Sequence, residues 1–317
     1  MMGTKASGRK VVQSDFGGVE VLEVAEERRP VPGVGEVLVQ VRAAGLNPVD
    51  AKSRDHAELP GQVPPFTLGW DVSGVVEEVG LGVAFHKVGD EVFGMPRFPE
   101  FAEAHGDYVV APARHLAKKP ESLSHVEAGA LPLAGLTARQ ALVDFADVRA
   151  GQRVLIHAAA GGVGHLAVQI AKARGAHVIA TASAPKHAML KELGVDEAVD
   201  YREVDFSQVV SDVNVVLDPL GGDCARRSAK VVADGGIVVS IKRGMEALDR
   251  EDEGRVRHGF MIVEPDLGGL RDIAEMVEAG SLRPVVSGVF ALEKAAEAHR
   301  AVDSGSTVGK LVFDLEK

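Results

Sequence analysis

The chain has 317 residues, a length that predicts two domains, or one domain with a large extension, at about 100–200 residues per domain. Hydrophobic residues make up 46% and charged residues 26%, a balance that excludes wholesale disorder. With 35 Lys and Arg against 46 Asp and Glu, the net charge is −11 and no basic run stands out, so we expect no nucleic-acid partner.

Cysteine usage and hydropathy point to a cytoplasmic protein. Cys224 is the only cysteine, so neither an intramolecular disulfide nor a zinc site with two or more thiolates can form. No stretch approaches the roughly 20 apolar residues of a membrane span, and the first ten residues lack the apolar core of a secretory signal. We therefore expect no membrane partner. The residues from Met2 to Ser7 satisfy a loose myristoylation pattern, which we interpret as a chance match.

The first part of the chain, from residue 9 to about residue 130, is predicted to be a β-rich unit. Short runs of β-branched and aromatic residues alternate there with Gly and Pro turn signals. The predicted strands are Val19–Val24, Glu36–Val41, Val72–Val79, Asp90–Phe93 and Tyr108–Ala111.

From about residue 135, apolar strands alternate with helical stretches, such as those over 163–174 and from Pro185 to Gly194. Strands of fully buried character separated by crossovers predict an α/β fold with a doubly wound parallel sheet. The six predicted strands are Val154–His157, Val178–Thr181, Ala198–Tyr201, Val213–Asp218, Ile237–Ile241 and Phe260–Val263.

The C-terminal part is predicted to return to the first unit. Helical segments at Leu270–Ala279 and Leu292–Val302 lead to a last strand, Lys310–Leu315, whose pattern matches the β-rich part. The charged run from Met245 to Arg257 is interpreted as a solvated loop or helix face.

A glycine-rich turn carries the strongest functional signal. Residues 158–164 read AAAGGVG and lie between a predicted strand and a predicted amphipathic helix. Such a turn lets backbone N–H groups approach a pyrophosphate at a helix N-terminus, which indicates dinucleotide binding. The strict G-x-G-x-x-G pattern would need Gly at position 159, where Ala stands. Close packing of a helix on a strand by small residues is the alternative.

The residues after the second strand of this sheet favour NADPH over NADH. An NAD enzyme usually has Asp or Glu about 20 residues beyond the glycines, but the sequence there runs from Ala182 to Lys186 without an acid. Ser183 can donate a hydrogen bond and Lys186 supplies a positive charge, and both suit a 2′-phosphate. Alternatively, Lys186 is an ordinary lysine on a helix surface.

Several segments together resemble one family. The turn AAAGGVG, the helix AVQIAKARGA, the segment ATASAPKHAMLKELGVDEAVDY, and the earlier GLNPVDAK and TLGWDVSGVV resemble the medium-chain dehydrogenase/reductase superfamily, in its zinc-independent, zeta-crystallin-like quinone oxidoreductase branch. The resemblance implies a GroES-like β-rich catalytic domain at 1–131, completed by 268–317. It also implies a Rossmann NADPH-binding domain at 132–267.

The resemblance also implies a set of cofactor ligands and a homodimer. Tyr201 matches a family tyrosine that helps to hold the 2′-phosphate, and Thr137 matches a threonine beside the nicotinamide. The strand Phe260–Val263, apolar and at the sheet edge, is expected to pair across a two-fold axis. The full expected cofactor-binding set is Thr137, Gly161, Gly162, Val163, Gly164, Ser183, Lys186, Tyr201, Asp218, Ser240 and Phe260.

No metal site is expected. Zinc-dependent relatives carry a G-H-E motif and a catalytic cysteine, whereas this chain has Gly69-Trp70-Asp71 and a lone Cys224 in its second half. Without zinc, the substrate must be reducible by hydride alone. Quinones and α,β-unsaturated carbonyl compounds qualify because hydride addition leaves a delocalised oxyanion that one or two hydrogen-bond donors can stabilise.

Three residues are candidates for catalysis. The segment from Asn47 to Lys52 resembles the family's N-x-x-D loop, in which the Asn side chain approaches the nicotinamide ribose or the substrate. Lys52 either stabilises an enolate or protonates a carbon through water, or it is an exposed loop lysine. Asp50 either contributes to the site or anchors the loop.

The expected function is NADPH-dependent hydride transfer to a small hydrophobic carbonyl or quinone substrate. Two alternatives stay open from the sequence. One is an enoyl or alkene reductase of a biosynthetic pathway, and the other is a non-catalytic NADPH-binding protein with a structural or regulatory role.

Overall fold

The computed structural model describes residues 7–242 and 252–317, and the chain divides into two compact units. The first unit extends to Leu136 and resumes over Glu264–Gly280 and Pro284–Lys317, and the second contains Thr137–Val263 and Ser281–Arg283. The boundaries expected after residues 131 and 267 differ from these by a few residues. The myristoylation pattern up to Ala6, and residues 245–251 of the charged run, lie outside the described residues.

The first unit contains a two-stranded and a seven-stranded sheet. Its strands are β1 (Ser7–Gln13), β2 (Leu22–Arg28), β3 (Glu36–Leu46), β4 (Val72–Val79), β5 (Glu91–Gly94), β6 (Tyr108–Pro112), β7 (Leu116–Lys118), β14 (Val286–Phe290) and β15 (Lys310–Asp314). Its helices are α1 (Pro48–Asp55), α2 (His125–Gly129), α8 (Leu267–Glu278) and α9 (Ala295–Asp303), with single 3₁₀ turns η1 (Val19–Val21), η2 (Ala113–His115) and η5 (Leu292–Lys294). The helix α3 (Pro132–Arg139) crosses the boundary between the units.

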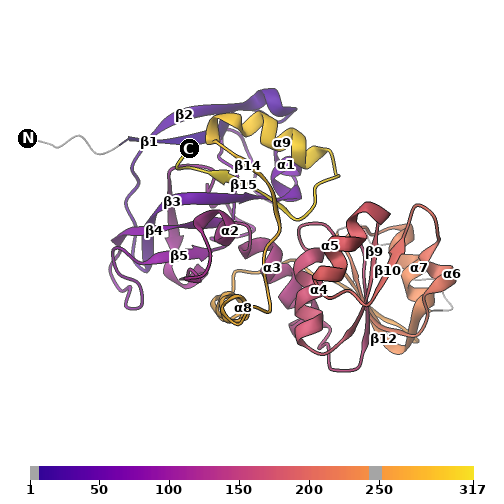
Figure 1. Cartoon of the computed structure of the whole chain (residues 1–317). Helices are drawn as coiled ribbons and strands as arrows, with labels where there is room; N and C mark the ends of the chain where they lie inside the picture. The colour runs from indigo at the N-terminus through magenta and orange to yellow at the C-terminus, as the bar shows by residue number, and fades with distance from the viewer. Residues whose placement is uncertain (1–6, 243–251) are drawn as a thin grey trace, which may run out of the picture. The chain divides into compact units, whose positions relative to one another are not determined.

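Strand β3 organises the larger sheet. The strand order is β14-β15-β3-β4-β5-β7, with β6 also paired to β3. The last strand, β15, runs antiparallel to the end of β3, with Leu311 opposite Leu46, so the C-terminal segment rejoins the first unit as the sequence predicts (Figure 1). The core of this unit combines the two ends of the chain, since Val39 and Leu46 of β3 pack in one cluster with Ala298 of α9 and Phe313 of β15.

Three local predictions in the first unit were wrong or incomplete. The strands β1, β7 and β14 were not predicted, and the predicted strand Val19–Val24 is a 3₁₀ turn up to Val21 that is followed by β2. The segment from Asn47 to Lys52 is not a loop, because α1 begins at Pro48. Pro48 occupies the first helical position, and the Asp50 carboxylate accepts a hydrogen bond from the Asn47 N–H, which closes the helix start.

The second unit is a doubly wound α/β domain. Its strands are β8 (Arg153–Ile156), β9 (His177–Ala182), β10 (Glu197–Asp200), β11 (Val213–Asp218), β12 (Val232–Ser240) and β13 (Arg257–Phe260). Its helices are α4 (Gly164–Ala173), α5 (His187–Glu192), α6 (Phe206–Val209) and α7 (Asp223–Val231), with a 3₁₀ turn η4 (Ala184–Lys186) and a π-helix η3 (Gln140–Phe145). The strand order is β10-β9-β8-β11-β12-β13 and all of these neighbours pair in parallel, which is the Rossmann arrangement.

The last strand of this sheet does not lie where the sequence predicts it. Strand β13 covers Arg257–Phe260, so only Phe260 of the predicted strand Phe260–Val263 belongs to it. Strand β12 ends at Ser240, which pairs with Phe260, so the residues after Phe260 have no residue of β12 opposite them. The edge strand is therefore largely polar, and the apolar edge expected at a dimer interface is reduced to Phe260, which is 39% exposed.

In the part of the chain that the structure describes, no helix is long and apolar enough to cross a membrane.

Candidate functional site

The predicted cofactor residues of the second unit gather at one edge of its sheet. Because parallel strands end at the same edge, the loops that follow them lie together. The strand order reverses between β8 and β11, and ligands of doubly wound sheets bind at such a point. The glycine turn follows β8, Ser183 follows β9, Tyr201 follows β10, and Asp218, Ser240 and Phe260 are the last residues of β11, β12 and β13.

The glycine turn has backbone donors available for an anion. Ala158 adopts a left-handed conformation with φ 47°, and the Gly161 N–H donates back to its carbonyl oxygen at 2.8 Å. Within the described residues, the N–H groups of Gly162 and Val163 donate to no protein acceptor. They directly precede α4, whose N-terminus carries a partial positive charge. A pyrophosphate fits this combination of donors and dipole.

The last glycine of the turn has a different task. A Cβ atom on Gly164 would lie 2.5 Å from the carbonyl oxygen of Ala158 and 2.6 Å from the Cα atom of Ala159. The first turn of α4 therefore packs directly on the backbone that leaves β8. Gly164 thus permits close packing of helix on strand, while the N–H of Gly162 has no protein acceptor among the described residues.

Polar and basic groups follow β9 and β10. Ser183 lies directly before η4, and Tyr201 follows β10 with its side chain 56% exposed. The guanidinium carbon of Arg202 lies 5.9 Å from the centre of the Tyr201 ring. The sequence reasoning missed Arg202, although its position directly after Tyr201 was the available signal.

One acid also lies at this end of the sheet. The Asp200 carboxylate accepts hydrogen bonds from the backbone N–H groups of Arg202 and Ala184, each at 2.9 Å. The bond from Arg202, with help from the one from Ala184, holds the pKa of Asp200 below its usual value. Since each carboxylate oxygen already has a backbone donor, Asp200 ties the end of β10 to the loop after β9.

Two predicted ligands are turned into the protein. The buried Asp218 carboxylate accepts hydrogen bonds from the N–H groups of Leu220 at 2.9 Å and Gly221 at 3.0 Å. Burial raises the pKa of Asp218, and these two bonds oppose that effect. The Ser240 hydroxyl donates to the Asp218 carbonyl oxygen at 3.3 Å. Both residues therefore shape the loop after β11. Thr137 lies in α3 and is 5% exposed.

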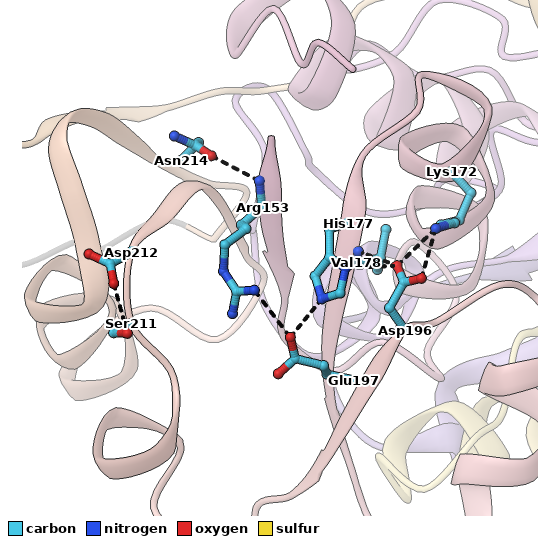
Figure 2. A network of polar contacts seen from close by, with 9 residues as sticks. All are labelled: Arg153, Lys172, His177, Val178, Asp196, Glu197, Ser211, Asp212 and Asn214. Carbon is cyan, nitrogen blue, oxygen red and sulfur yellow. Dashed lines mark hydrogen bonds and ion pairs between the residues drawn. The ribbon is translucent and has the colours of Figure 1, made fainter. Parts of the chain in front are cut away.

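The opposite edge of the same sheet carries a polar network that binds only itself (Figure 2). Glu197, the first residue of β10, accepts from His177 Nε2 at 2.6 Å and from Arg153 Nη1 at 3.2 Å, and these are the first residues of β9 and β8. The hydrogen bond from His177, and then the charge of Arg153, lower the pKa of Glu197. This network joins three strand starts and offers no arrangement for a ligand.

A buried histidine supports the carboxyl edge from beneath. His157 Nδ1 lies 2.9 Å from the Thr181 hydroxyl, and its Nε2 lies 2.9 Å from the Ser228 hydroxyl. Burial lowers the pKa of His157 to about 3, so the ring is neutral at physiological pH. It is a core histidine that links the end of β8 to β9 and α7.

In the first unit, the candidate Asn47 belongs to a buried polar cluster. Its Nδ2 donates to Asp71 Oδ2 at 2.9 Å, and its Oδ1 accepts from Lys310 Nζ. Lys310 Nζ also contacts Asp71 Oδ2 at 3.1 Å and donates to the Leu46 carbonyl oxygen at 2.9 Å. The side chains of Lys310 and Asp71 are 3% and 0% exposed, so this is a buried ion pair.

Asp50 lies beside this cluster and keeps one oxygen without a partner. Its Oδ2 accepts from the Asn47 N–H at 2.7 Å, whereas its buried Oδ1 has no hydrogen-bond partner among the described residues. Burial raises the pKa of Asp50 to about 7, and the negative charge of Asp71 acts in the same direction. The observed role of Asp50 is to close the start of α1.

Lys52 lies outside the cluster. Its side chain is 47% exposed, and its Nζ lies 3.6 Å from Glu58 Oε1. Four aromatic rings of the first unit pack in pairs, with the Trp70 and Phe98 rings 5.4 Å apart and the Phe66 and Phe101 rings 4.9 Å apart.

The one possible metal ligand in Gly69-Trp70-Asp71 is the Asp71 carboxylate, and both of its oxygens have protein partners. Asp71 Oδ2 faces Asn47 and Lys310, and its Oδ1 accepts from the Leu133 N–H at 2.6 Å. Across 7–242 and 252–317, no group of three or more His, Cys, Asp or Glu side chains is arranged to hold a metal ion.

The sequence reasoning missed Asp71 and Lys310 as members of a site. Asp71 was noted only because it stands where zinc-dependent relatives have Glu. Lys310 opens the strand sequence KLVFD, and a charged residue at the start of an otherwise apolar, buried strand was the available signal.

Comparison with known proteins gives consistent results. The family model described as alcohol dehydrogenase GroES-like domain matches residues 33–121, and the one described as zinc-binding dehydrogenase matches residues 193–313. The quinone oxidoreductase of Sus scrofa is 31% identical over 98% of this chain and 100% of its own length. The NADPH-dependent alkenal/one oxidoreductase of Arabidopsis thaliana chloroplasts is 35% identical over 95% of this chain and 78% of its own.

Solved structures agree on the fold, and one of them names NAD. The quinone oxidoreductase from Coxiella burnetii superimposes with a TM-score of 0.90 at 35% identity, covering 98% of this chain and 100% of its own. A structure described as an NAD-dependent alcohol dehydrogenase gives 0.89 at 36% identity, covering 97% and 99%. The comparisons alone therefore do not decide between NADH and NADPH.

The packing at Gly164 leads to a first prediction. Gly164→Ala should lower the free energy of unfolding by about 1–3 kcal/mol because the added methyl group meets backbone atoms that cannot move aside. Gly161→Ala is the matched control, since its Cβ would meet only the Ala158 carbonyl oxygen at 3.2 Å. Urea unfolding of both variants measures the difference. A Gly164→Ala variant more stable than the wild type, as the higher helix propensity of Ala alone would make it, would contradict the packing role.

Proposed function

The chain belongs to the medium-chain dehydrogenase/reductase superfamily, in its quinone oxidoreductase branch, and from this premise we propose that it reduces quinones or α,β-unsaturated carbonyl compounds with NADPH and without zinc. The chain is an NAD(P)H-dependent oxidoreductase, so the non-catalytic alternative is not favoured. The observation that carries the proposal is the carboxyl edge of the second unit's sheet, where two free backbone donors lie at a helix N-terminus and hydroxyl and basic side chains follow the next two strands.

The choice of NADPH rests on the groups after β9 and β10. Ser183, Lys186, Tyr201 and Arg202 offer hydroxyl and cationic groups for a 2′-phosphate. Asp200, at the end of β10, accepts a backbone N–H with each of its oxygens, and no acid stands from Ser183 to Lys186 after β9, where the usual acceptor of a ribose hydroxyl lies. Gly162 and Val163 would hold the pyrophosphate through their N–H groups.

When bound, NADPH supplies a hydride, and the carbonyl oxygen of the acceptor becomes an oxyanion that later takes a proton from water. The chain must stabilise that oxyanion. Asn47 retains one amide hydrogen that has no acceptor in the described part of the chain, and we assign it the role of donor to the oxyanion. Lys52 is the second candidate donor, and its exposure makes its contribution smaller.

The remaining expectations stand as further proposals. The substrate is a small hydrophobic quinone or enone. If it is an enone, the alternative function of an enoyl or alkene reductase in a biosynthetic pathway stays open. A homodimer through β13 has less support than the sequence suggested. Arg257 and His258 stand in this edge strand, where apolar residues were expected. A cytoplasmic location also stays a proposal.

A turnover screen tests the function directly. The purified protein, dialysed against a chelator, should oxidise NADPH in the presence of quinones, enals or enones, with NADH as the control cofactor. Metal analysis should find no stoichiometric zinc, since Asp71 is committed to Lys310 and Asn47. Loss of activity on chelation that added zinc restores would overturn the metal-independent proposal, and no oxidation with any acceptor would overturn the proposed function.

Lys186 tests the choice of cofactor. A charged hydrogen bond is worth about 1.5–3 kcal/mol, so Lys186→Ala should weaken NADPH binding about 10- to 150-fold and leave NADH binding nearly unchanged. Lys191→Ala, at an exposed lysine of α5, the helix that follows Lys186, is the matched control and should change neither affinity. Titration of cofactor fluorescence gives both dissociation constants. An equal loss for the two cofactors would refute the 2′-phosphate assignment.

Lys52 tests the preference between substrate classes. If its ammonium stabilises the developing enolate, Lys52→Ala should lower kcat for an enone about 10-fold, with a smaller loss for a quinone, whose reduced oxyanion is better stabilised by itself. Lys118→Ala, at another exposed lysine of the first unit, serves as control. Enone turnover within about threefold of wild type, or about 0.7 kcal/mol, would identify Lys52 as a surface lysine paired with Glu58.

A further inference from the structure

The amide of Asn47 lies between two groups of opposite charge. An ammonium has only hydrogens to donate and a carboxylate has only lone pairs to accept, so each can face one end of an amide. Lys310 Nζ donates to Oδ1, and Asp71 Oδ2 accepts from Nδ2 at 2.9 Å. If the amide were flipped, its NH₂ group would face the ammonium of Lys310 and its oxygen would face the carboxylate of Asp71. The orientation of Asn47 is therefore fixed by the chemistry of its neighbours.

The two neighbours are themselves held by the backbone. Asp71 Oδ1 accepts from the Leu133 N–H at 2.6 Å, and Lys310 Nζ donates to the Leu46 carbonyl oxygen at 2.9 Å. Gly45 leaves room for the carboxylate, because a Cβ atom there would lie 2.6 Å from Asp71 Oδ2. With both partners anchored, a rotation of the Asn47 side chain would break two charged hydrogen bonds at once.

We propose that Lys310 and Asp71 are positioning residues that hold the Asn47 amide in one orientation and so aim its remaining N–H at the carbonyl oxygen of the substrate. This inference rests on the proposed function. The ammonium also draws electron density from Oδ1, which strengthens the N–H groups of the same amide as donors. Neither Lys310 nor Asp71 need touch the substrate for this effect.

A purely structural explanation is less satisfactory. A buried ion pair gives little net stability, because the loss of hydration offsets most of the attraction between the charges, and apolar residues of similar size often do as well. Yet Lys310 and Asp71 are 3% and 0% exposed and meet from distant parts of the chain. The charged pair can fix the orientation of the Asn47 amide, which apolar side chains could not do. This role explains why a pair that is costly to bury is present.

The test removes both charges together. Replacing Lys310 alone would leave a buried carboxylate unpaired and could prevent folding, so the informative variant is the double substitution Lys310→Met with Asp71→Asn. An amide at position 71 can donate or accept, so it no longer selects one orientation of Asn47. We expect a melting temperature close to wild type, an unchanged Kd for NADPH, and a kcat for an enone lowered at least 10-fold.

The matched control is another buried lysine of the same unit. Lys119 is 6% exposed, lies 3.2 Å from Glu91, and donates to the carbonyl oxygens of Pro120 and Leu123. Its neutral double variant, Lys119→Met with Glu91→Gln, removes an ion pair whose lysine is buried and whose carboxylate is 54% exposed, and which touches no candidate site residue. We expect its kcat to stay within about twofold of wild type.

A double-mutant cycle with Asn47→Ala separates positioning from a general effect on folding. If Lys310 and Asp71 act through Asn47, then Asn47→Ala should lower kcat at least 10-fold in the wild type and less than about threefold in the charge-neutral variant. Additive losses, or a charge-neutral variant with kcat within threefold of wild type, would overturn the inference. A wild type that reduces no quinone or enone would instead overturn the proposed function.

Discussion

The buried ammonium of Lys310 is the constraint on which the first unit depends. It lies at the start of β15 and contacts the end of β3 through Leu46, the start of α1 through Asn47, and the segment before β4 through Asp71. A lysine almost never loses its hydration without several partners, so these segments must arrive in register for the charge to be tolerated. One side chain thereby couples the pairing of the last strand to the geometry of the candidate site.

The second unit solves a different problem, because its sheet must be open to a ligand at one edge and closed at the other. At the amino edge, Glu197 accepts hydrogen bonds from both Arg153 and His177 and so ties three strand starts together. At the carboxyl edge, Asp200 and Asp218 accept from the loops that follow the strands and so give those loops a fixed shape. The N–H groups of Gly162 and Val163 have no acceptor among the described residues, and an anion can satisfy them.

Much of this arrangement could be predicted from the sequence, since buried parallel strands are continuous apolar runs and the glycine turn lies between a strand and a helix. The errors have local causes. Strand β13 has the sequence RHGF, so the prediction placed the strand on Phe260 and the apolar residues 261–263 instead. Asn47-Pro48 starts a helix, although this pair is equally typical of a turn. The partners of Asp71 and Asn47 could not be predicted, because Lys310 lies 239 and 263 positions away and nothing in the local pattern refers to it.

The separation between Asn47 and Lys310 also has a consequence for biosynthesis. A ribosome adds about 5–20 residues per second, so on the order of tens of seconds pass between the emergence of β3 and that of β15. During this interval the whole second unit is made, while the carboxylate of Asp71 has no counter-ion and the edge of β3 that β15 will cover has no partner. The nascent first unit therefore stays incomplete until late in synthesis, and its exposed strand edge is the part of the chain that most needs protection by a chaperone.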